Sequence, residues 1–217
     1  MEKAIQPIQF NKVSRTFIVF FAIAVGLYPM IYYLVDMHHK GLLQSKPASL
    51  LHDTLWHTLF YTHITFGGLA LLTGWSQFST KLRIKYLKAH KQIGKVYLIS
   101  VLLSGLAGLY IAFYATGGII SKLGFGTLAV IWVLSALMAY IRILQKNIPA
   151  HQSWMLRNYG LTFAAVTLRL WLPFSQIALH LDFIKAYHIA AWLCWLPNLL
   201  FAEVIIYIFM GRKHAGE

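Results

Sequence analysis

The chain has 217 residues, of which 59% are hydrophobic, 15% aromatic and only 12% charged. Average soluble chains are about 45–50% apolar and about 25% charged, so an ordinary soluble domain is excluded. The formal net charge of +13 would suit a nucleic-acid partner only if the basic residues clustered on a water-exposed face, but they are scattered between apolar runs, and nucleic acid is not an expected partner.

Six apolar runs follow one another along the chain. A bilayer core of roughly 30 Å requires about 20 mostly apolar residues in a helix. The predicted spans cover residues 17–35, 54–78, 92–115, 123–141, 155–179 and 186–210. The first run follows Arg15 and lacks a small-residue cleavage pattern, which favours a retained span over a signal peptide. The predicted fold class is all-α, a single polytopic domain over residues 1–217 with six transmembrane helices in one bundle.

The loop charges predict the orientation of that bundle. With six spans both termini share one face, and its cations outnumber its two acids, Glu2 and Glu217. These cations are Lys3, Lys12, Arg15, Lys81, Arg83, Lys85, Lys88, Lys91, Lys95, Arg142, Lys146, Arg157, Arg212 and Lys213. On the other face Lys40, Lys46, Lys122 and Lys185 are nearly balanced by Asp36, Asp53 and Asp182. The positive-inside rule therefore places both termini in the cytoplasm, and the basic face should attract anionic lipid headgroups.

Glycine and proline positions predict how the spans connect and bend. Gly117 and Gly118 mark a very short outer turn, which makes the third and fourth spans antiparallel neighbours. Pro29, Pro173 and Pro197 lie inside the first, fifth and sixth spans, where kinks are expected and tolerated.

Two histidines lie where the third and fifth spans begin. His90 opens the third span and His151 immediately precedes the fifth, both on the cytoplasmic face. Because these spans run in the same direction, both side chains enter the bundle at similar depth, as two axial ligands of one haem iron must. The pattern predicts a haem b ligated by His90 and His151. A metal ion, proton handling, or a pair of interfacial histidines meeting lipid headgroups are the alternatives.

A second polar site is predicted deeper in the bundle. His63 lies about nine residues into the second span, roughly 13 Å deep, and Arg169 lies at a similar depth in the fifth. Ionisable side chains are costly there and are functional candidates. Arg169 is expected to face a haem propionate near His63 or to pair with Asn198, and Arg157 is a second cation for a propionate. The alternatives are an interhelical hydrogen bond for His63 and a structural tether for Arg169.

Glycines accompany two of these histidines. Gly67 follows His63 by four residues and Gly94 follows His90 by four, so each glycine lies beside its histidine on one helical face. The missing side chain is expected to leave room for the edge of a macrocycle. The alternative is close helix packing, for which glycine is common in membrane helices.

The remaining ionisable groups give weaker indications. Glu203, in the sixth span, is expected to pair with Arg157 or to shuttle protons. A metal site is a minor alternative for the outer histidines, which are His38, His39, His52 and His57. Cys194 is the only cysteine, so thiol clusters for zinc or iron–sulfur are excluded.

The stretch from His151 to Arg169 reads HQSWMLRNYGLTFAAVTLR. Further matching positions are His63 with Gly67; His90, Lys91, Gly94, Lys95 and Tyr97; Gly124, Phe125 and Gly126 with Trp132; and Trp195, Leu196, Pro197 and Asn198 followed by Glu203. With these motifs the chain, over roughly residues 60 to 205, resembles a bacterial family of inner-membrane proteins catalogued as a domain of unknown function. The resemblance implies a multi-pass protein of the bacterial inner membrane and no established activity.

In the arrangement of its histidines the chain also resembles the ascorbate-reducible transmembrane cytochromes b. Those proteins carry ligand histidines on four consecutive helices of a six-helix fold and hold one haem near each face. Here the histidines at 63, 90 and 151 lie on the second, third and fifth spans, and the fourth span has none. The likeness implies a haem held by His90 and His151, and it leaves His63 without a matching ligand.

These observations favour a membrane b-type cytochrome-like electron-transfer protein, with the lipid bilayer as its surroundings and a quinone or other membrane subunits as partners. One alternative is a cofactor-free accessory or assembly subunit of a larger membrane complex, in which the histidines make interhelical hydrogen bonds. Another is a proton-coupled transporter that uses Glu203, Arg169 and His63. Hydrolase and kinase motifs are absent from the sequence.

Overall fold

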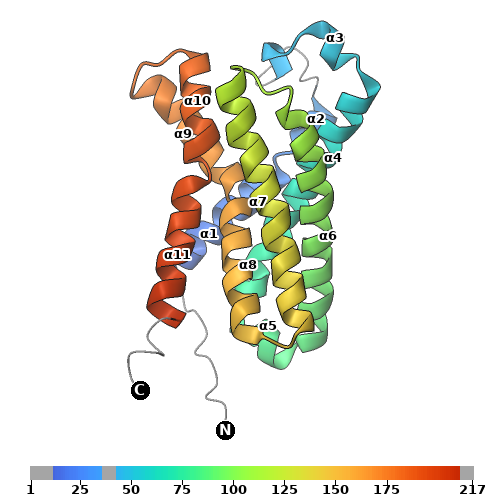
Figure 1. Ribbon diagram of the computed structural model, residues 1–217, viewed down its shortest axis with the longest axis vertical. Coiled ribbons are helices and arrows are strands. Elements are labelled where there is room, and N and C mark those ends of the chain that lie inside the picture. Colours follow the sequence, from blue (N-terminus) through green and yellow to red (C-terminus); the bar gives the residue numbers. More distant parts are fainter. Residues whose placement is uncertain (1–11, 36–42, 211–217) are drawn as a thin grey trace.

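The computed structural model describes residues 12–35 and 43–210, and these residues form helices and loops with no strand among them (Figure 1). The helices are α1 (Lys12–Leu27), α2 (Met30–Leu34), α3 (Ala48–Leu51), α4 (Thr54–Gly74), α5 (Thr80–Lys85), α6 (Leu87–Ala112), α7 (Ile119–Leu144), α8 (Ile148–Thr162), α9 (Ala164–Ile177), α10 (Phe183–Leu193) and α11 (Leu196–Met210). Two short 3₁₀ turns, η1 (Leu43–Ser45) and η2 (Trp75–Phe78), lie in the connections. The predicted all-α class is confirmed.

Four long helices form the centre of the bundle. Going round it, α4 packs on α6, α6 on α7 and α7 on α8, and α8 closes the ring with a smaller contact to α4. In such a ring α6 and α8 stand diagonally opposite one another. Helix α1 packs across α4 and α9, while α10 packs on α7 and α9 and α11 on α8 (Figure 1). The ring therefore allows side chains of α6 and α8 to meet across the core.

The turn between α6 and α7 follows the prediction. Gly117 and Gly118 have φ angles of 89° and 73°, a region that side chains other than glycine rarely adopt. The two helices pack as antiparallel neighbours, as expected. A Cβ at Gly117 would lie 2.8 Å from Nε2 of His188. Glycine is therefore required there by space as well as by conformation.

Proline interrupts the helices at two of the three positions where kinks are predicted. Pro29 separates α1 from α2, because it has no N–H to continue the ladder. Pro197 has the same effect near the start of α11, so the sixth predicted span is divided into α10 and α11. Pro173, by contrast, remains inside α9. The fifth predicted span is divided at Phe163 instead, just after Thr162 bonds back to the carbonyl of Asn158, a contact that bends helices.

Four helical segments are long and apolar enough to cross a membrane. They are Lys12–Leu34, Leu87–Ala112, Ile119–Leu144 and Phe183–Ile208. These segments correspond to the first, third, fourth and sixth predicted spans. The second predicted span, residues 54–78, is α4 followed by the η2 turn, and the fifth, residues 155–179, is the broken pair α8 and α9. A polytopic membrane bundle is therefore supported.

Candidate functional site: two histidine centres in the bundle

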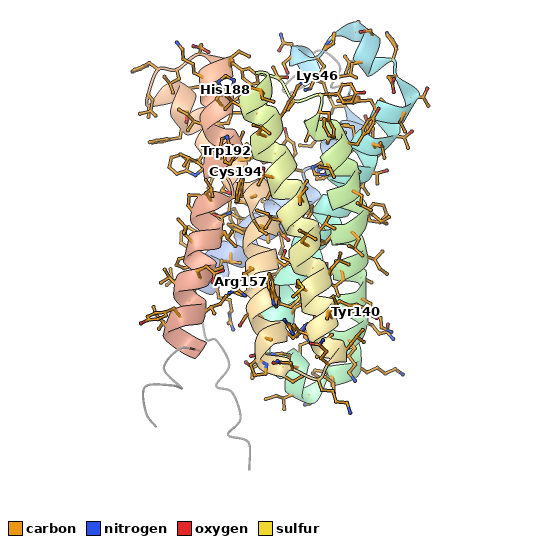
Figure 2. All side chains as sticks on the ribbon, viewed as in Figure 1. Lys46, Tyr140, Arg157, His188, Trp192 and Cys194 are labelled. Atoms are coloured by element: carbon orange, nitrogen blue, oxygen red, sulfur yellow. The ribbon has the colours of Figure 1, made fainter. Side chains whose placement is uncertain are left out.

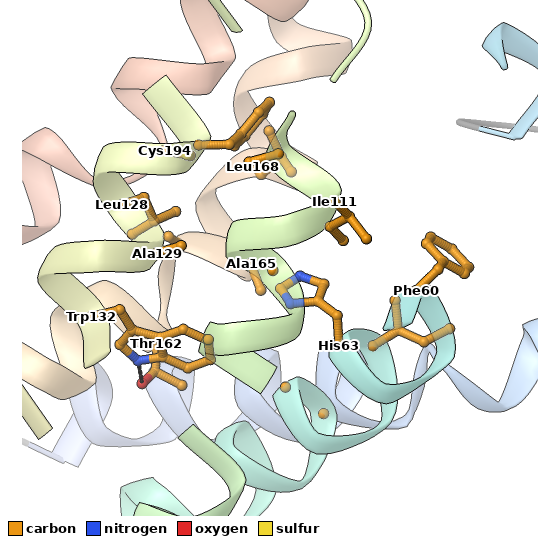
Figure 3. A pocket seen from close by; sticks show the side chains of 18 of the residues that line it. Phe60, His63, Ile111, Leu128, Ala129, Trp132, Thr162, Ala165, Leu168 and Cys194 are labelled. Carbon is orange, nitrogen blue, oxygen red and sulfur yellow. Dashed lines mark hydrogen bonds between the residues drawn. The ribbon is translucent and has the colours of Figure 1, made fainter. Parts of the chain in front are cut away.

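A buried hydrogen-bond network joins α6, α7 and α8 in the middle of the bundle. The hydroxyl of Tyr97 donates to Oδ1 of Asn158 over 2.5 Å and lies 2.9 Å from Oγ1 of Thr162. Asn158 donates through Nδ2 to the carbonyl of Trp132 and to Ser135, both at 2.8 Å. Nε1 of Trp132 donates to Thr162 over 2.8 Å (Figure 3). This network fixes which faces of α6 and α8 meet across the diagonal.

His90 and His151 lie on those same two faces. Each is seven residues before a member of the network, His90 before Tyr97 and His151 before Asn158. Seven residues are nearly two helical turns, so each histidine lies below its partner on the same face, about 10.5 Å along the axis. His90 also interacts electrostatically with His151. The two histidines of the predicted pair therefore lie on the sides of α6 and α8 that face one another.

In each of these two rings one nitrogen remains available to a ligand. Nδ1 of His151 lies 2.8 Å from the carbonyl oxygen of Ala139 on α7. Because a carbonyl only accepts, Nδ1 carries the proton and Nε2 of the neutral ring keeps its lone pair. Nδ1 of His90 is buried and has no hydrogen-bond partner in the described residues. A backbone bond that orients a histidine and leaves its other nitrogen open is the usual support of a metal-ligating histidine.

Two cations lie near His90. The charges of Arg83 and Lys91 both act on His90. Burial lowers the pKa of Arg83, whose Nε is buried without a hydrogen-bond partner in the described part of the chain. Unpartnered buried polar atoms are costly, so His90 and Arg83 are groups that a bound acidic cofactor would satisfy.

The second centre is a cavity of about 230 Å³ in the other half of the bundle (Figure 3). Its walls are mostly apolar, and many of them are glycine or alanine. The polar groups among its lining include His63, Arg169, Thr162 and Lys46. Thr162 also belongs to the hydrogen-bond network, so the network borders this cavity. His63 and Arg169, which the sequence predicts at similar depth, therefore border one cavity.

His63 is anchored to α6 by its backbone-facing nitrogen. Its Nδ1 lies 2.9 Å from the carbonyl of Ser104, whose hydroxyl donates back to the carbonyl of His63 over 2.8 Å. A Cβ at Gly108 would lie 2.8 Å from the same nitrogen, so the imidazole lies directly on that glycine. The carbonyl requires the proton on Nδ1. Nε2 of the neutral ring is then an acceptor on the cavity side, and Figure 3 shows the ring directed towards Ala165.

Arg169 enters the same cavity from α9. Its guanidinium donates to the carbonyl of Ala165 over 2.7 Å and lies over the ring of Tyr28 at 4.6 Å from the centroid. Within residues 12–35 and 43–210 no carboxylate forms an ion pair with it. Its charge acts on His63. Asn198, the other predicted partner, instead donates to Gly160, Thr167 and Cys194.

Arg157 and Glu203 form a bidentate ion pair between α8 and α11. Nε and one terminal nitrogen of Arg157 donate to the two carboxylate oxygens over 2.5 and 2.8 Å. The guanidinium of Arg157, which Figure 2 labels, also lies over the ring of Trp154 at 4.8 Å from the centroid. The predicted pairing is confirmed. Arg157 is therefore held on the α11 side of α8 rather than left open towards a cofactor.

The other histidines and the two glycines are placed as follows. His188 is hydrogen-bonded to the carbonyl of Gly117 through Nε2, the ring of His57 packs at a tilt against Tyr61, and His52 is exposed. His38 and His39 lie outside the described residues. No group of three or more His, Cys, Asp or Glu side chains within the described ranges could hold a metal ion. Gly67 lines the cavity, whereas the space beside Gly94 is taken by Gln77, whose Oε1 would lie 3.1 Å from an added Cβ.

The comparisons with known proteins agree with this picture of the chain. The model of the family described as "Predicted membrane protein (DUF2306)" matches residues 60–206. The chain belongs to this family. No curated protein and no solved structure is a match for it. The matched region of this family member begins just before His63 and ends just after Glu203, so it contains both histidine centres and the ion pair.

Proposed function

We propose that this DUF2306 protein is a membrane b-type cytochrome-like electron-transfer protein in which His90 and His151 hold one haem near the cytoplasmic face. The observation that carries the proposal is the position of both histidines two turns below the Tyr97–Asn158 hydrogen bond. That common offset directs the two imidazoles to one space between α6 and α8. When bound, haem supplies one-electron transfer.

The residues around the pair would each have a separate task. The carbonyl of Ala139 fixes the ring of His151 so that Nε2 is directed to the ligand. His90 would contribute a nitrogen from the opposite helix. Arg83 and Lys91 would balance the negative charge of the propionates and raise the reduction potential. Above the pair, the Tyr97–Asn158 hydrogen bond would limit how far α6 and α8 separate.

The proposal also includes six crossings of a bacterial inner membrane by one domain, with both termini on the cytoplasmic side. The four long apolar segments support it, and so does the passage of α4 and of the α8–α9 pair through the same bundle. The basic residues of α5 and those of the α7–α8 connection lie at one end of the bundle (Figure 1). That common end supports a cytoplasmic basic face. Tagging each loop with a membrane-impermeant label would test the topology.

A pyridine haemochrome assay on the purified full-length protein tests haem binding directly. We expect one haem per chain and a Soret band that is lost from both His90→Ala and His151→Ala. His180→Ala, an exposed histidine of the α9–α10 loop, is the matched control and should keep the spectrum. Colourless protein after reconstitution with haem, or an unchanged spectrum in both ligand variants, contradicts the proposal.

A cofactor-free accessory or assembly subunit is the second candidate function. It is favoured by the fact that His63 and His151 each already make a hydrogen bond to a neighbouring helix. Such bonds stabilise membrane helix contacts without any cofactor. Co-purification of a colourless chain with a larger membrane complex would support this candidate. A transporter that depends on free Glu203 is less compatible with the bidentate bond to Arg157.

A further inference from the structure

We infer that the cavity between His63 and Arg169 binds a lipid-soluble hydroquinone, with the ring hydroxyl held between the two side chains. The inference deepens the proposed function because it names a substrate class for an electron-transfer protein, but it concerns a second site with its own residues. None of the residues proposed to ligate haem lines this cavity.

The cavity pairs one hydrogen-bond acceptor with one donor. The carbonyl of Ser104 fixes the proton of His63 on Nδ1, so Nε2 accepts a hydrogen bond from a ligand. Arg169 only donates, and the structure commits it to a single backbone carbonyl. A ligand that satisfies both must offer a proton to the histidine and a lone pair to the arginine. A hydroxyl does both with one oxygen atom.

The chemistry of His63 and Arg169 also selects the kind of hydroxyl. A carboxylic acid is ionised at neutral pH and has no proton to offer Nε2, whereas a phenolic hydroxyl, with a pKa of about 10, keeps its proton. A phenolic oxygen also accepts a charge-assisted hydrogen bond from a guanidinium. An aromatic alcohol therefore matches the pair better than a fatty acid does.

The rest of the cavity wall indicates the chemistry of the remainder of the ligand. Apart from the polar groups already named, the cavity is lined mainly by aliphatic and aromatic side chains, with Gly67, Ala112, Ala129 and Ala165 among its small residues. Such a wall favours an apolar ring, and Trp56, Phe60 and Trp132 offer aromatic faces to it. A hydroquinone with an alkyl tail combines the apolar body with the required hydroxyl.

The test is a binding titration of the purified full-length chain in detergent with decylubiquinol under anaerobic conditions. Quenching of tryptophan fluorescence reports occupancy, because Trp56 and Trp132 line the cavity. Saturable binding is expected for the wild type. The dimethyl ether of the same hydroquinone lacks the hydroxyl protons, so it should bind at least about tenfold more weakly.

Variants test the two anchors. Arg169→Gln and His63→Ala should each raise the Kd at least about tenfold. Arg142→Gln and His52→Ala, which change a cation and a histidine outside the cavity, should leave the Kd unchanged. Equal affinity for the hydroquinone and its dimethyl ether, an unchanged Kd in both anchor variants, or tighter binding of oleate than of the hydroquinone overturns the inference.

The outcome is separable from that of the haem proposal. The titration needs no haem, so a protein without a Soret band that still binds decylubiquinol contradicts the proposed function and supports this inference. Conversely, a haem-loaded protein that makes no distinction between hydroquinone and ether overturns the inference alone. Because the ligand comparison uses the wild-type chain, it decides the question even when an anchor variant fails to fold.

Discussion

Removing the hydroxyl of Tyr97 should loosen the bundle between its two histidine centres. In Tyr97→Phe the ring is kept, but Oδ1 of Asn158 loses its donor and Oγ1 of Thr162 loses a partner. Side-chain hydrogen bonds in membrane bundles contribute on average about 0.6 and at most about 1.7 kcal/mol, and an unsatisfied buried acceptor costs about 1–3 kcal/mol. We expect a destabilisation of about 1–3 kcal/mol.

The matched control for this substitution is Tyr140→Phe. Tyr140 is on α7 and is 48% exposed, whereas Tyr97 is fully buried at 0% (Figure 2). Loss of the Tyr140 hydroxyl should change the free energy of unfolding by less than about 0.5 kcal/mol. Reversible unfolding in mixed detergent micelles, followed by circular dichroism, measures both variants. If Tyr97→Phe unfolds at the same denaturant fraction as Tyr140→Phe, the network does not hold α6 and α8 together and the reasoning fails.

Three further predictions concern other parts of the molecule. Gly68→Ala should destabilise the fold by about 1–3 kcal/mol, because its Cβ would lie 2.5 Å from a backbone oxygen of α1, whereas Gly126→Ala, with open space beside it, should be neutral in the same unfolding assay. Glu203→Gln should lower the melting temperature by removing one charge of the Arg157 ion pair, and the double variant that also carries Arg157→Met should recover part of the loss; no recovery would mean that the pair is not coupled. The third prediction rests on the pKa of Lys46, which burial and the nearby charge of Lys122 lower from 10.5 to about 8. The fold disfavours the charged form of Lys46, so the stability of the fold should rise as the pH increases from 8 to 10. Lys46→Gln should remove this pH dependence in thermal unfolding measured at a series of pH values.

Much of the architecture could be predicted from hydrophobic run length alone. Four predicted spans correspond to helices that are long and apolar enough to cross a membrane. In each of them the apolar stretch is at least as long as the bilayer core is thick. The boundaries were less accurate because helices extend past the apolar run, as α6 does by beginning at Leu87 rather than at residue 92. The break at Phe163 is not predicted, since no proline marks it; just before it the side chain of Thr162 bonds to the carbonyl of Asn158 in its own helix.

The depth of a residue in its span and the direction of that span are enough to choose the candidate residues, but they do not identify the hydrogen-bond partners of those residues. Counting residues from the span ends predicts that His63 lies near Arg169 and His90 near His151; the cavity lining is consistent with the first pair and the electrostatic interaction with the second. The carbonyls of Ser104 and Ala139, which set the tautomer of two of these rings, carry no sequence signal because every residue has a carbonyl. The space at Gly94 was misjudged for a similar reason, since Gln77 is brought there by tertiary packing.

One signal for the network was nonetheless present in the sequence. Along α6 the residues His90, Tyr97 and Ser104 follow one another at intervals of seven, and each makes or faces a polar contact with another helix. Three polar side chains at such spacing define one face of a helix, over about 21 Å of its length. A polar stripe is costly against lipid and is retained where it faces the bundle interior. Helix α6 therefore ties the two centres to one rigid element, with the Tyr97 network between them.

Helix α6 would couple the two histidine centres mechanically. Because α6 carries one candidate haem ligand directly and holds His63 through Ser104, a rotation of this helix moves both sites at once. The glycines that let α6 approach its neighbours, Gly105 against α7 and Gly108 against His63, leave little space for such a rotation. A ligand in the cavity would therefore affect the His90–His151 centre through a rigid helix rather than through a helix movement. Gly105→Ala should therefore perturb the haem spectrum and hydroquinone affinity together, since its Cβ would overlap a methyl of Val133 on α7. A variant in which only one of the two readouts changes would show that the centres are mechanically independent.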